Sequence, residues 1–193
     1  NVIIGIAESL IDWATGQLSK QTVFNLSLIA SSGRRLSHLV NDLLDFSQLK
    51  HKEIELNIKA VGLREVTDIV LMLSQPLAKN KSLALVNNID PNLPPIDADE
   101  NRLQQILYNL VGNAIKFTES GTVEVSATVI DQEIEVSVSD TGMGIPVNKL
   151  EQIFESFEQA NGSISREYGG TGLGLTITKQ LVQLHGGNIR AES

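Results

Sequence analysis

The spacing of apolar residues changes once along this chain of 193 residues, near position 50, and that change constrains the fold most. Before it, apolar residues recur in steps of seven, as Ile29, Leu36 and Leu43 do, and as Leu39 and Phe46 do. Steps of seven over two turns are typical of helices that pack along a common seam. After it, several short segments alternate between apolar and polar residues, which indicates strands. The chain is therefore predicted to combine lengthwise-packed helices with a separate α/β unit.

Residues 1–52 are predicted to form an antiparallel helical hairpin. One helix runs through Trp13, and the second follows an N-cap at Ser19 and continues to about Lys50. Val40 and Leu44 widen the apolar stripe of the second helix beyond a two-position seam. The excess favours packing against a second copy as a four-helix bundle. A helix pair that lies on the core of its own chain is the alternative.

Residues 53–193 are predicted to form a two-layer α/β sandwich, with helices over one face of a mixed sheet, so the chain as a whole is of the α+β class. Strands are expected at 55–60, 83–89, 122–130 and 133–140, with a last strand at 187–191 that is truncated, and helices at 63–77, 99–117 and 171–185. The buried face of the helix at 99–117 is expected to comprise Leu103, Ile106, Leu107, Leu110 and Ile115. The stretch 141–170 has little periodicity and is too long for an ordinary connection, which predicts a functional loop.

Charge and composition exclude several classes of function. Residues 1–59 carry six acidic and six basic residues, so the 17 acidic and nine basic residues of 60–193 account for the whole net charge of −8. Such an acidic surface argues against binding to a nucleic acid backbone. The absence of cysteine excludes disulfides, thiolate zinc sites and a cysteine nucleophile. No stretch is apolar enough to span a bilayer and no signal peptide opens the chain, so no direct membrane contact and a cytoplasmic location are expected. Membrane anchoring of a parent protein is left open.

Three segments carry candidate chemistry, and the first lies on the predicted helix at 99–117. Asn109, Asn113 and Lys116 are spaced i, i+4 and i+7, so they share one face. Amide oxygens are ligands for a hard cation, and a lysine ammonium is a point charge for phosphate. A solvated helix face would explain the same residues if the segment stood alone.

The second segment, Asp140–Pro146, follows the end of a predicted strand. A carboxylate here can accept a hydrogen bond from an exocyclic amine, while Gly142 and Gly144 let a flat ring approach the backbone. An ordinary Asp-Thr-Gly turn is the alternative interpretation. Aspartic proteases carry the same three letters, but they need two such carboxylates and the chain has no second copy.

The third segment, Gly169–Leu175, is a glycine-rich run that leads into a predicted helix. Free backbone N–H groups at a helix start can bind an anion. The run is not a Walker A loop, because no Gly-Lys-Ser/Thr follows, and its glycine spacing differs from that of the dinucleotide fingerprint. A glycine hinge that binds no ligand is the alternative.

In this order and on these elements, the three segments resemble the N, G1 and G2 boxes of the sensor histidine kinase ATP-binding domain, whose fold is shared with gyrase, MutL and Hsp90. Phe154–Phe157 is similar to the F box, and Leu39–Ser47 resembles the second helix of the dimerisation and phosphotransfer domain. Asp99–Thr118 resembles the form common in hybrid kinases. The resemblance covers essentially the whole chain, with 1–52 as a partial phosphotransfer hairpin and 53–193 as the ATP-binding domain.

The resemblance implies a role for each matching residue. Asn113 would hold Mg²⁺, while Asn109 and Lys116 would contact phosphates and take part in catalysis. Asp140 would read the adenine amino group. The remaining positions would border the base and the triphosphate, and they are Gly142, Gly144, Gly170, Thr171, Gly172, Leu173 and Gly174. Residues 147–168 would form an ATP lid, with Arg166 as a phosphate contact.

The implied function is that of a protein histidine kinase, which uses Mg-ATP to phosphorylate a histidine and passes the phosphoryl group to an aspartate in a response regulator receiver domain. A homodimer through the helical hairpin is implied as well. The His-Glu-x-x-Thr-Pro acceptor box is not in these residues, and Asn1–Gly5 is similar to its continuation. The acceptor is therefore expected a few residues upstream, and this chain, taken as a fragment, is not expected to autophosphorylate. His185 is expected to cap the last helix.

Two alternatives to the kinase remain at this point. One is a non-catalytic dimeric signalling module, in which bound nucleotide only fixes the lid or no nucleotide binds. The other is a gyrase-type ATPase, but Asn109 stands where the gyrase-like relatives have the glutamate that activates water, and an amide cannot take up a proton. Slow ATP hydrolysis is therefore expected.

Overall fold

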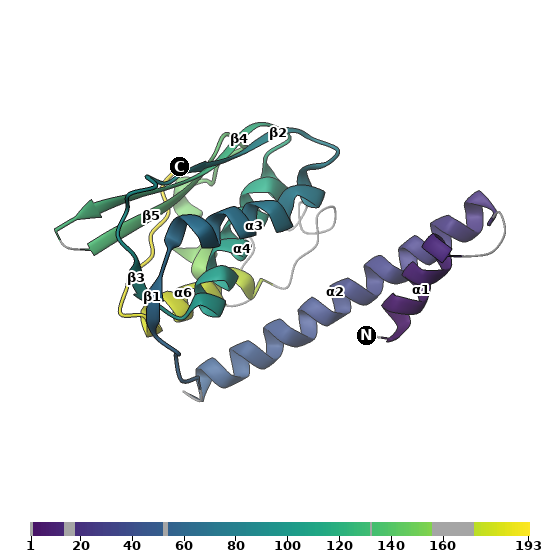
Figure 1. Ribbon diagram of the computed structural model, residues 1–193, viewed down its shortest axis with the longest axis horizontal. Coiled ribbons are helices and arrows are strands. Elements are labelled where there is room, and N and C mark those ends of the chain that lie inside the picture. The colour runs from purple at the N-terminus through teal and green to yellow at the C-terminus, as the bar shows by residue number, and fades with distance from the viewer. Residues whose placement is uncertain (1, 14–17, 52–53, 132, 156–171) are drawn as a thin grey trace. The chain divides into compact units, whose positions relative to one another are not determined.

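The computed structural model of the chain describes residues 2–13, 18–51, 54–131, 133–155 and 172–193 (Figure 1). The chain divides into two compact units, Asn1–Lys52 and Glu53–Ser193. The first unit holds α1 (Val2–Trp13) and α2 (Lys20–Lys50). The Oγ of Ser19 accepts a hydrogen bond from the backbone nitrogen of Thr22 at 3.1 Å, which confirms the predicted N-cap of α2.

Helices α1 and α2 approach each other closely through small residues. Ala7 and Ala30 are buried, and a Cβ added to Gly33 would lie 2.8 Å from Cγ1 of Ile4. Arg34 on α2 forms an ion pair with Glu8 on α1. Large apolar side chains elsewhere on this unit remain exposed, and they are Val2, Ile3, Ile6, Leu10, Phe24, Leu28, Ile29, Leu36, Leu39, Val40, Leu43 and Leu44. Much apolar surface of the hairpin is thus left uncovered.

The second unit is an α/β sandwich with a mixed sheet, as the sequence predicts. In chain order its elements are β1 (Lys59–Val61), α3 (Leu63–Ala78), β2 (Ser82–Asn88), β3 (Ile96–Ala98), α4 (Glu100–Phe117), β4 (Ser120–Ile130), β5 (Glu133–Asp140), the 3-10 turns η1 (Val147–Lys149) and η2 (Gln152–Phe154), and α6 (Gly174–Leu184). The main sheet has the order β2-β4-β5, with β2 parallel and β5 antiparallel to β4. Strands β1 and β3 form a separate antiparallel pair.

Helices α3 and α4 cover one face of the main sheet (Figure 1). The centre of this layer is fully buried and includes Val70 of α3, Val111 of α4, and Val123 and Val125 of β4. Full burial of one such side chain contributes about 1.5–3 kcal/mol. The apolar face of α4 is therefore fixed on the sheet, and its polar face is turned away from it.

Two predicted strands differ in the structure. The strand expected at 55–60 is reduced to Lys59–Val61, because the backbone N–H of Asn57 donates to the Asp99 carboxylate at 2.9 Å instead of joining a sheet. Residues 187–193 form no strand. Side chains fasten this segment: Nη2 of Arg190 lies 2.6 Å from Oε2 of Glu135, and the Oγ of Ser193 accepts from the backbone nitrogen of Ile145 at 2.8 Å.

Three smaller expectations are also corrected. Helix α6 begins at Gly174, since Gly172 has a φ of +70°, in the left-handed region that a right-handed helix cannot include; Thr171 lies outside the described residues. Strand β4 begins at Ser120, two residues before its expected start. Leu110 is only half-buried, unlike the rest of its predicted set.

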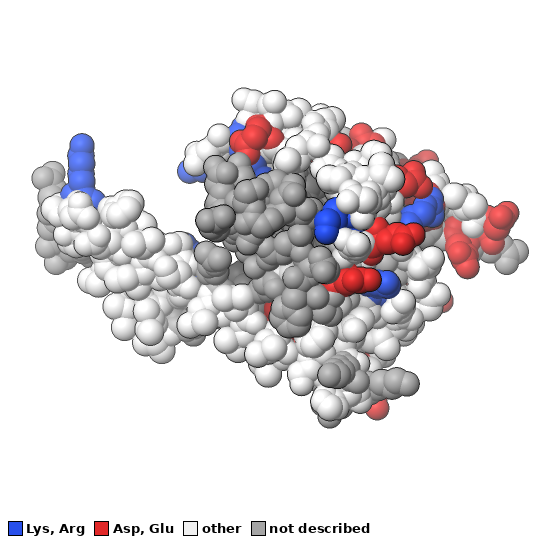
Figure 2. All heavy atoms as spheres, turned by 180° about the vertical axis from the view of Figure 1, so that it is seen from behind, with Lys and Arg blue, Asp and Glu red and all other residues white. Residues whose placement is uncertain are grey.

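The surface of the second unit carries both signs of charge. Asp and Glu side chains are interspersed with Lys and Arg on the face shown in Figure 2. The side-chain carboxylates of Glu135 and Glu192 accept hydrogen bonds from Arg190 and thereby raise the pKa of its guanidinium. Within the described part of the chain, no helix has both the length and the apolar character needed to cross a membrane.

Candidate functional site

Helix α4 carries the first group of candidate residues, and its N-terminus is capped by Asp99. The Asp99 carboxylate accepts from the backbone nitrogen of Arg102 at 3.1 Å and from that of Asn57 at 2.9 Å. Burial acts to raise the pKa of Asp99, but hydrogen bonds from backbone N–H groups, led by that of Asn57, and the charge of Arg102 outweigh it and lower the pKa. The cap therefore fixes where α4 begins and which residues face the sheet.

On the face of α4 away from the buried set lie Asn109, Asn113 and Lys116, and all three are half-buried. The ammonium of Lys116 lies 5.0 Å from the ring centroid of Phe117, a cation–π distance. The spacing predicted from the sequence thus places two amides and an ammonium along one side of a helix.

The start of α6 lies against this face. The Nδ2 of Asn109 donates to the carbonyl oxygen of Gly174 at 3.4 Å and to the Oγ1 of Thr178 at 3.5 Å. A Cβ added to Gly174 would lie 3.8 Å from Cγ of Asn109, an ordinary contact distance. The structure therefore brings the asparagine of the first candidate segment together with the helix that follows the third.

The second segment meets the other end of α4. Oδ1 of Asp140 accepts from the Oγ1 of Thr118 at 3.2 Å and from the backbone nitrogen of Gly142 at 2.8 Å. The backbone nitrogen of Met143 donates to the carbonyl oxygen of Phe117 at 3.4 Å. Among the described residues, none donates a hydrogen bond to Oδ2 of Asp140. This carboxylate is therefore oriented by one oxygen, while the other can accept from a ligand.

Gly142 sits where no larger residue fits. A Cβ at this position would lie 2.5 Å from the carbonyl oxygen of Phe117 and 2.7 Å from both Oδ1 of Asp140 and Oγ1 of Thr118. Gly144 has a φ of +71°, which other residues rarely adopt. Both glycines of the second segment are thus required by the backbone itself.

The third segment and the predicted lid are described only in part. Gly172, Leu173 and Gly174 are described, and Leu173 is buried. In the described part of the predicted lid, Phe154 is buried and the turn that contains it contacts α6. Gly170, Thr171, Phe157 and Arg166 lie outside the described residues.

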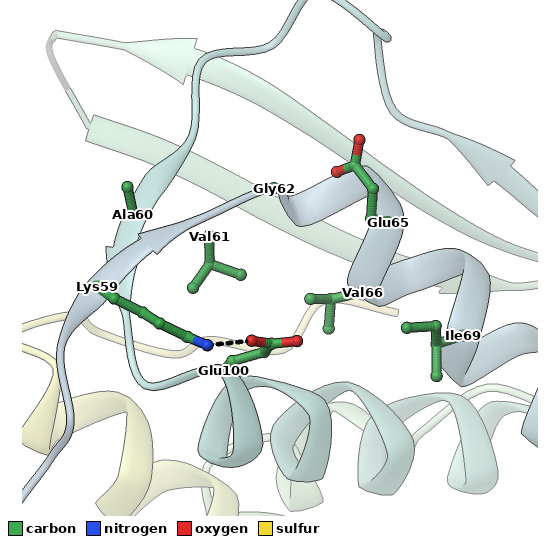
Figure 3. A pocket seen from close by; sticks show the side chains of 8 residues that line it. All are labelled: Lys59, Ala60, Val61, Gly62, Glu65, Val66, Ile69 and Glu100. Carbon is green, nitrogen blue, oxygen red and sulfur yellow. Dashed lines mark ion pairs between the residues drawn. The ribbon is translucent and has the colours of Figure 1, made fainter.

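A shallow pocket of about 340 Å³ lies apart from this arrangement, at the N-terminal end of α4 (Figure 3). Its wall combines Val61, Val66 and Ile69 with an ion pair in which Nζ of Lys59 lies 2.5 Å from Oε2 of Glu100. Glu100 is the first residue of α4, so Asn113 lies about 20 Å further along the helix axis at 1.5 Å per residue. The lysine of this pocket is thus paired with a carboxylate of α4.

Sequence reasoning gave no role to two residues that the structure places next to the candidate site, Thr118 and Lys81. Thr118 is buried and joins the end of α4 to Asp140. The ammonium of Lys81 donates to three backbone carbonyls at the same helix end. Neither residue belongs to a periodic pattern, and the only available signal was that Thr118 directly follows the helix that carries the first segment.

Two family models match the chain in order. Residues 1–52 match the His Kinase A (phospho-acceptor) domain, and residues 98–193 match the histidine kinase-, DNA gyrase B- and HSP90-like ATPase.

Curated relatives align over nearly the whole chain. It is 40% identical over 194 residues to the circadian input-output histidine kinase CikA of Synechococcus elongatus, covering 99% of this chain and 26% of that protein. It is 42% identical over 175 residues to the signal transduction histidine-protein kinase BarA of Escherichia coli K12, covering 88% of this chain and 19% of that protein. The chain therefore spans only about a quarter or less of these relatives.

Solved structures are similar to this chain in fold as well as in sequence. Full-length ShkA in complex with AMPPNP has a TM-score of 0.76 and 36% identity, over 95% of this chain and 38% of that one. The nucleotide-free catalytic domain of histidine kinase ThkA has a TM-score of 0.61 and 29% identity, over 71% of this chain and 89% of that one. Both family models, in this order, together with relatives that are named histidine kinases, show that the chain belongs to the histidine kinase family.

Proposed function

We propose that residues 53–193 bind Mg-ATP between the polar face of α4 and the loop after β5, and supply its γ-phosphoryl group to a histidine. The observation that carries this proposal is that α4 meets both other candidate segments: Asn109 lies against Gly174, and Thr118 orients Asp140. Support also comes from the ATPase family model over 98–193 and from the similarity to ShkA, whose solved structure contains AMPPNP.

In this proposal Asp140 accepts a hydrogen bond from the adenine amino group through Oδ2. Gly142 and Gly144 border the base, because the absence of a side chain at both positions lets a flat ring approach the backbone. Asn109 and Lys116 contact the phosphates. The glycine-rich run borders the triphosphate, with Gly172, Leu173 and Gly174 among the described residues and Gly170 and Thr171 outside them.

The residues present suit a magnesium ion that is held largely by its nucleotide. Among the described residues, no group of three or more His, Cys, Asp or Glu side chains could form a metal cage. Magnesium commonly keeps several waters and binds through substrate phosphates and one or two protein oxygens. The amide oxygen of Asn113 would be such a ligand. When bound, the ion would neutralise charge on the phosphates.

The proposed reaction is phosphoryl transfer to an imidazole. The bond between the γ-phosphorus and the β,γ-bridging oxygen breaks, a nitrogen–phosphorus bond forms on the histidine, and ADP leaves. A neutral imidazole is a nucleophile without a strong base, so Asn109 can take the place that a general base has in hydrolytic relatives. Positioning and charge are then the main contributions of this chain.

The acceptor and the partners belong to the whole protein. His185 does not fit as the acceptor, because both of its ring nitrogens are hydrogen-bonded within the unit. We expect an acceptor histidine associated with the phosphotransfer hairpin, dimerisation through residues 1–52, and relay to an aspartate of a receiver domain. We also expect the kinase region to work in the cytoplasm.

Mg-dependent ATP binding tests the nucleotide site directly. Isothermal titration of the chain should show binding that weakens at least about tenfold in Asp140→Asn, since a hydrogen bond to a charged group contributes about 1.5–3 kcal/mol. Asn113→Ala should lose most of its dependence on magnesium. Asp97→Asn and Asn101→Ala, which change exposed residues of the same types, are the matched controls.

Three outcomes would separate this proposal from its alternatives. Affinity in the unmodified chain no higher than in both site variants would favour a non-catalytic module. Sustained phosphate release from ATP would favour a gyrase-type ATPase. In the whole protein, γ-labelled ATP should yield an acid-labile phosphohistidine, and its absence would contradict phosphoryl transfer.

A further inference from the structure

Lys81 lies in the short connection between α3 and β2, and its ammonium is turned inward. Its Nζ lies 2.8 Å from the carbonyl oxygen of Ile115, 3.1 Å from that of Lys116 and 3.0 Å from that of Thr118. It also lies 3.0 Å from Oε1 of Glu119. The Lys81 side chain is only 17% exposed, whereas that of Glu119 is 69% exposed. Most of the environment of the ammonium is therefore backbone carbonyl.

These carbonyls belong to the end of α4, where a helix leaves its last four C=O groups without intrahelical partners. An ammonium has three N–H donors and can satisfy several of them at once. A cation is also favourable at the negative end of the helix dipole. Lys81 thus caps α4 from a distant part of the sequence.

The same helix end holds the loop that carries Asp140. The carbonyl oxygen of Phe117 accepts from the backbone of Met143, and Thr118 donates to Oδ1 of Asp140. Thr118 contributes its carbonyl oxygen to Lys81 and its hydroxyl to Asp140. A displacement of Thr118 would therefore disturb one of the two hydrogen bonds that orient the carboxylate, the other being donated by the backbone of Gly142.

We propose that Lys81 is a positioning residue for recognition of the purine base: it fixes the last turn of α4, and Thr118 passes that position to Asp140. Lys81 does not touch the nucleotide in this account. The inference rests on the proposed function, in which Asp140 reads the adenine amino group. Lys81 itself lies outside the three candidate segments.

A cap that only stabilised the unit would weaken binding of all nucleotides equally or not at all. A positioning role predicts that affinity falls only for a nucleotide whose base Asp140 recognises. ITP has the same triphosphate as ATP, but a carbonyl oxygen replaces the exocyclic amine, so the hydrogen bond from that amine to Asp140 is lost. The ratio of the two dissociation constants therefore reports the orientation of Asp140, while ITP affinity alone reports the phosphate end.

The test measures Kd for Mg-ATP and Mg-ITP in the 193-residue chain and in Lys81→Met, which keeps the length of the side chain but removes its charge and donors. The unmodified chain should prefer ATP by about 10- to 100-fold. Lys81→Met should reduce that preference at least about fivefold and leave ITP affinity within about threefold. Lys79→Met, an exposed lysine two residues earlier, should retain the full preference.

A second pair of variants applies if Lys81→Met does not fold. Lys81→Gln keeps one amide donor and should give an intermediate preference. Thr118→Val removes only the hydroxyl link and should reduce the preference while Lys81 stays in place. An unchanged ATP preference in any folded Lys81 variant overturns the inference. Equal binding of ATP and ITP by the unmodified chain contradicts the proposed role of Asp140 itself, and the inference falls with it.

Discussion

Nε2 of His185 lies 3.1 Å from the backbone nitrogen of Asp99 and accepts its hydrogen bond, so the end of α6 is tied to the cap of α4. Nδ1 of the same ring lies 2.7 Å from the carbonyl oxygen of Leu181. Because Nε2 accepts, Nδ1 carries the proton and donates to Leu181. The His185 imidazole thus joins α6 to the cap of α4, and Asn109 joins the same two helices further along through its hydrogen bonds to Gly174 and Thr178.

The stability contributed by Asp99 should depend on pH. Its pKa is lower in the folded chain than the ordinary value, so its contribution is present above that ordinary value of about 4 and is lost as pH falls through the lower folded value. Asp99→Asn keeps a side-chain oxygen for the cap but removes the charge. We expect the variant to be less stable than the unmodified chain at pH 7 and the difference to shrink towards pH 3.

Urea unfolding at pH 7, 5, 4 and 3 measures this difference. Asp131→Asn, at the exposed tip of the β4–β5 hairpin, controls for the loss of one acidic charge. A difference between Asp99→Asn and the unmodified chain that stays constant over this range would contradict the prediction.

Gly142→Ala should disturb the base end of the candidate site. The new Cβ would lie 2.5 Å from the backbone oxygen of Phe117, which cannot move as a flexible side chain can. We expect a loss of about 1–3 kcal/mol in the free energy of unfolding, as for other overpacked positions, and at least tenfold weaker ATP binding.

Gly112→Ala is the matched control, because a Cβ there meets nothing within 4 Å. Alanine within a helix should stabilise α4 by about 0.5–1 kcal/mol relative to glycine. Thermal unfolding and nucleotide titration of both variants provide the comparison. Equal behaviour of the two would show that the close approach at Gly142 has no consequence.

The exposed apolar residues of α2 should mediate self-association. Leu36 and Leu43 are 61% and 58% exposed, and burial of one leucine contributes about 1.5–3 kcal/mol. In Leu36→Glu/Leu43→Glu the dimer dissociation constant should therefore rise at least about tenfold. Sedimentation equilibrium measures it, with Ile130→Glu, an exposed apolar residue on β4, as the control. A monomeric unmodified chain at high concentration would refute this prediction.

Local signals were sufficient to predict most of the fold. Ser19 marks a helix start because its side-chain oxygen caps a backbone N–H group nearby in sequence. The alternation on either side of Asp131 predicted β4 and β5, because a period of two is also visible among residues that are close in the sequence. The strand expected at 55–60 was wrong in extent because the N–H of Asn57 binds a carboxylate 42 residues away, which no local pattern reveals.

In the candidate site, too, some residues could be predicted from a local pattern and others could not. Helical spacing alone placed Asn109, Asn113 and Lys116 on one face of α4, and the structure agrees. Lys81 acts on backbone carbonyls 34 to 37 residues further along the chain. Every residue has a backbone carbonyl, so the sequence does not indicate which carbonyls accept a hydrogen bond from a lysine.

Because Thr118 is hydrogen-bonded to Asp140, the geometry of α4 sets the distance between the two ends of the proposed nucleotide site. If Asn113 marks the magnesium end and Asp140 the base end, the span between them is set by the last turn of one helix and not by a hinge. One residue inserted after Asn113 would rotate Thr118 by about 100° around the axis and move it 1.5 Å along it. Insertions in this turn should therefore abolish ATP binding even where every named side chain is kept.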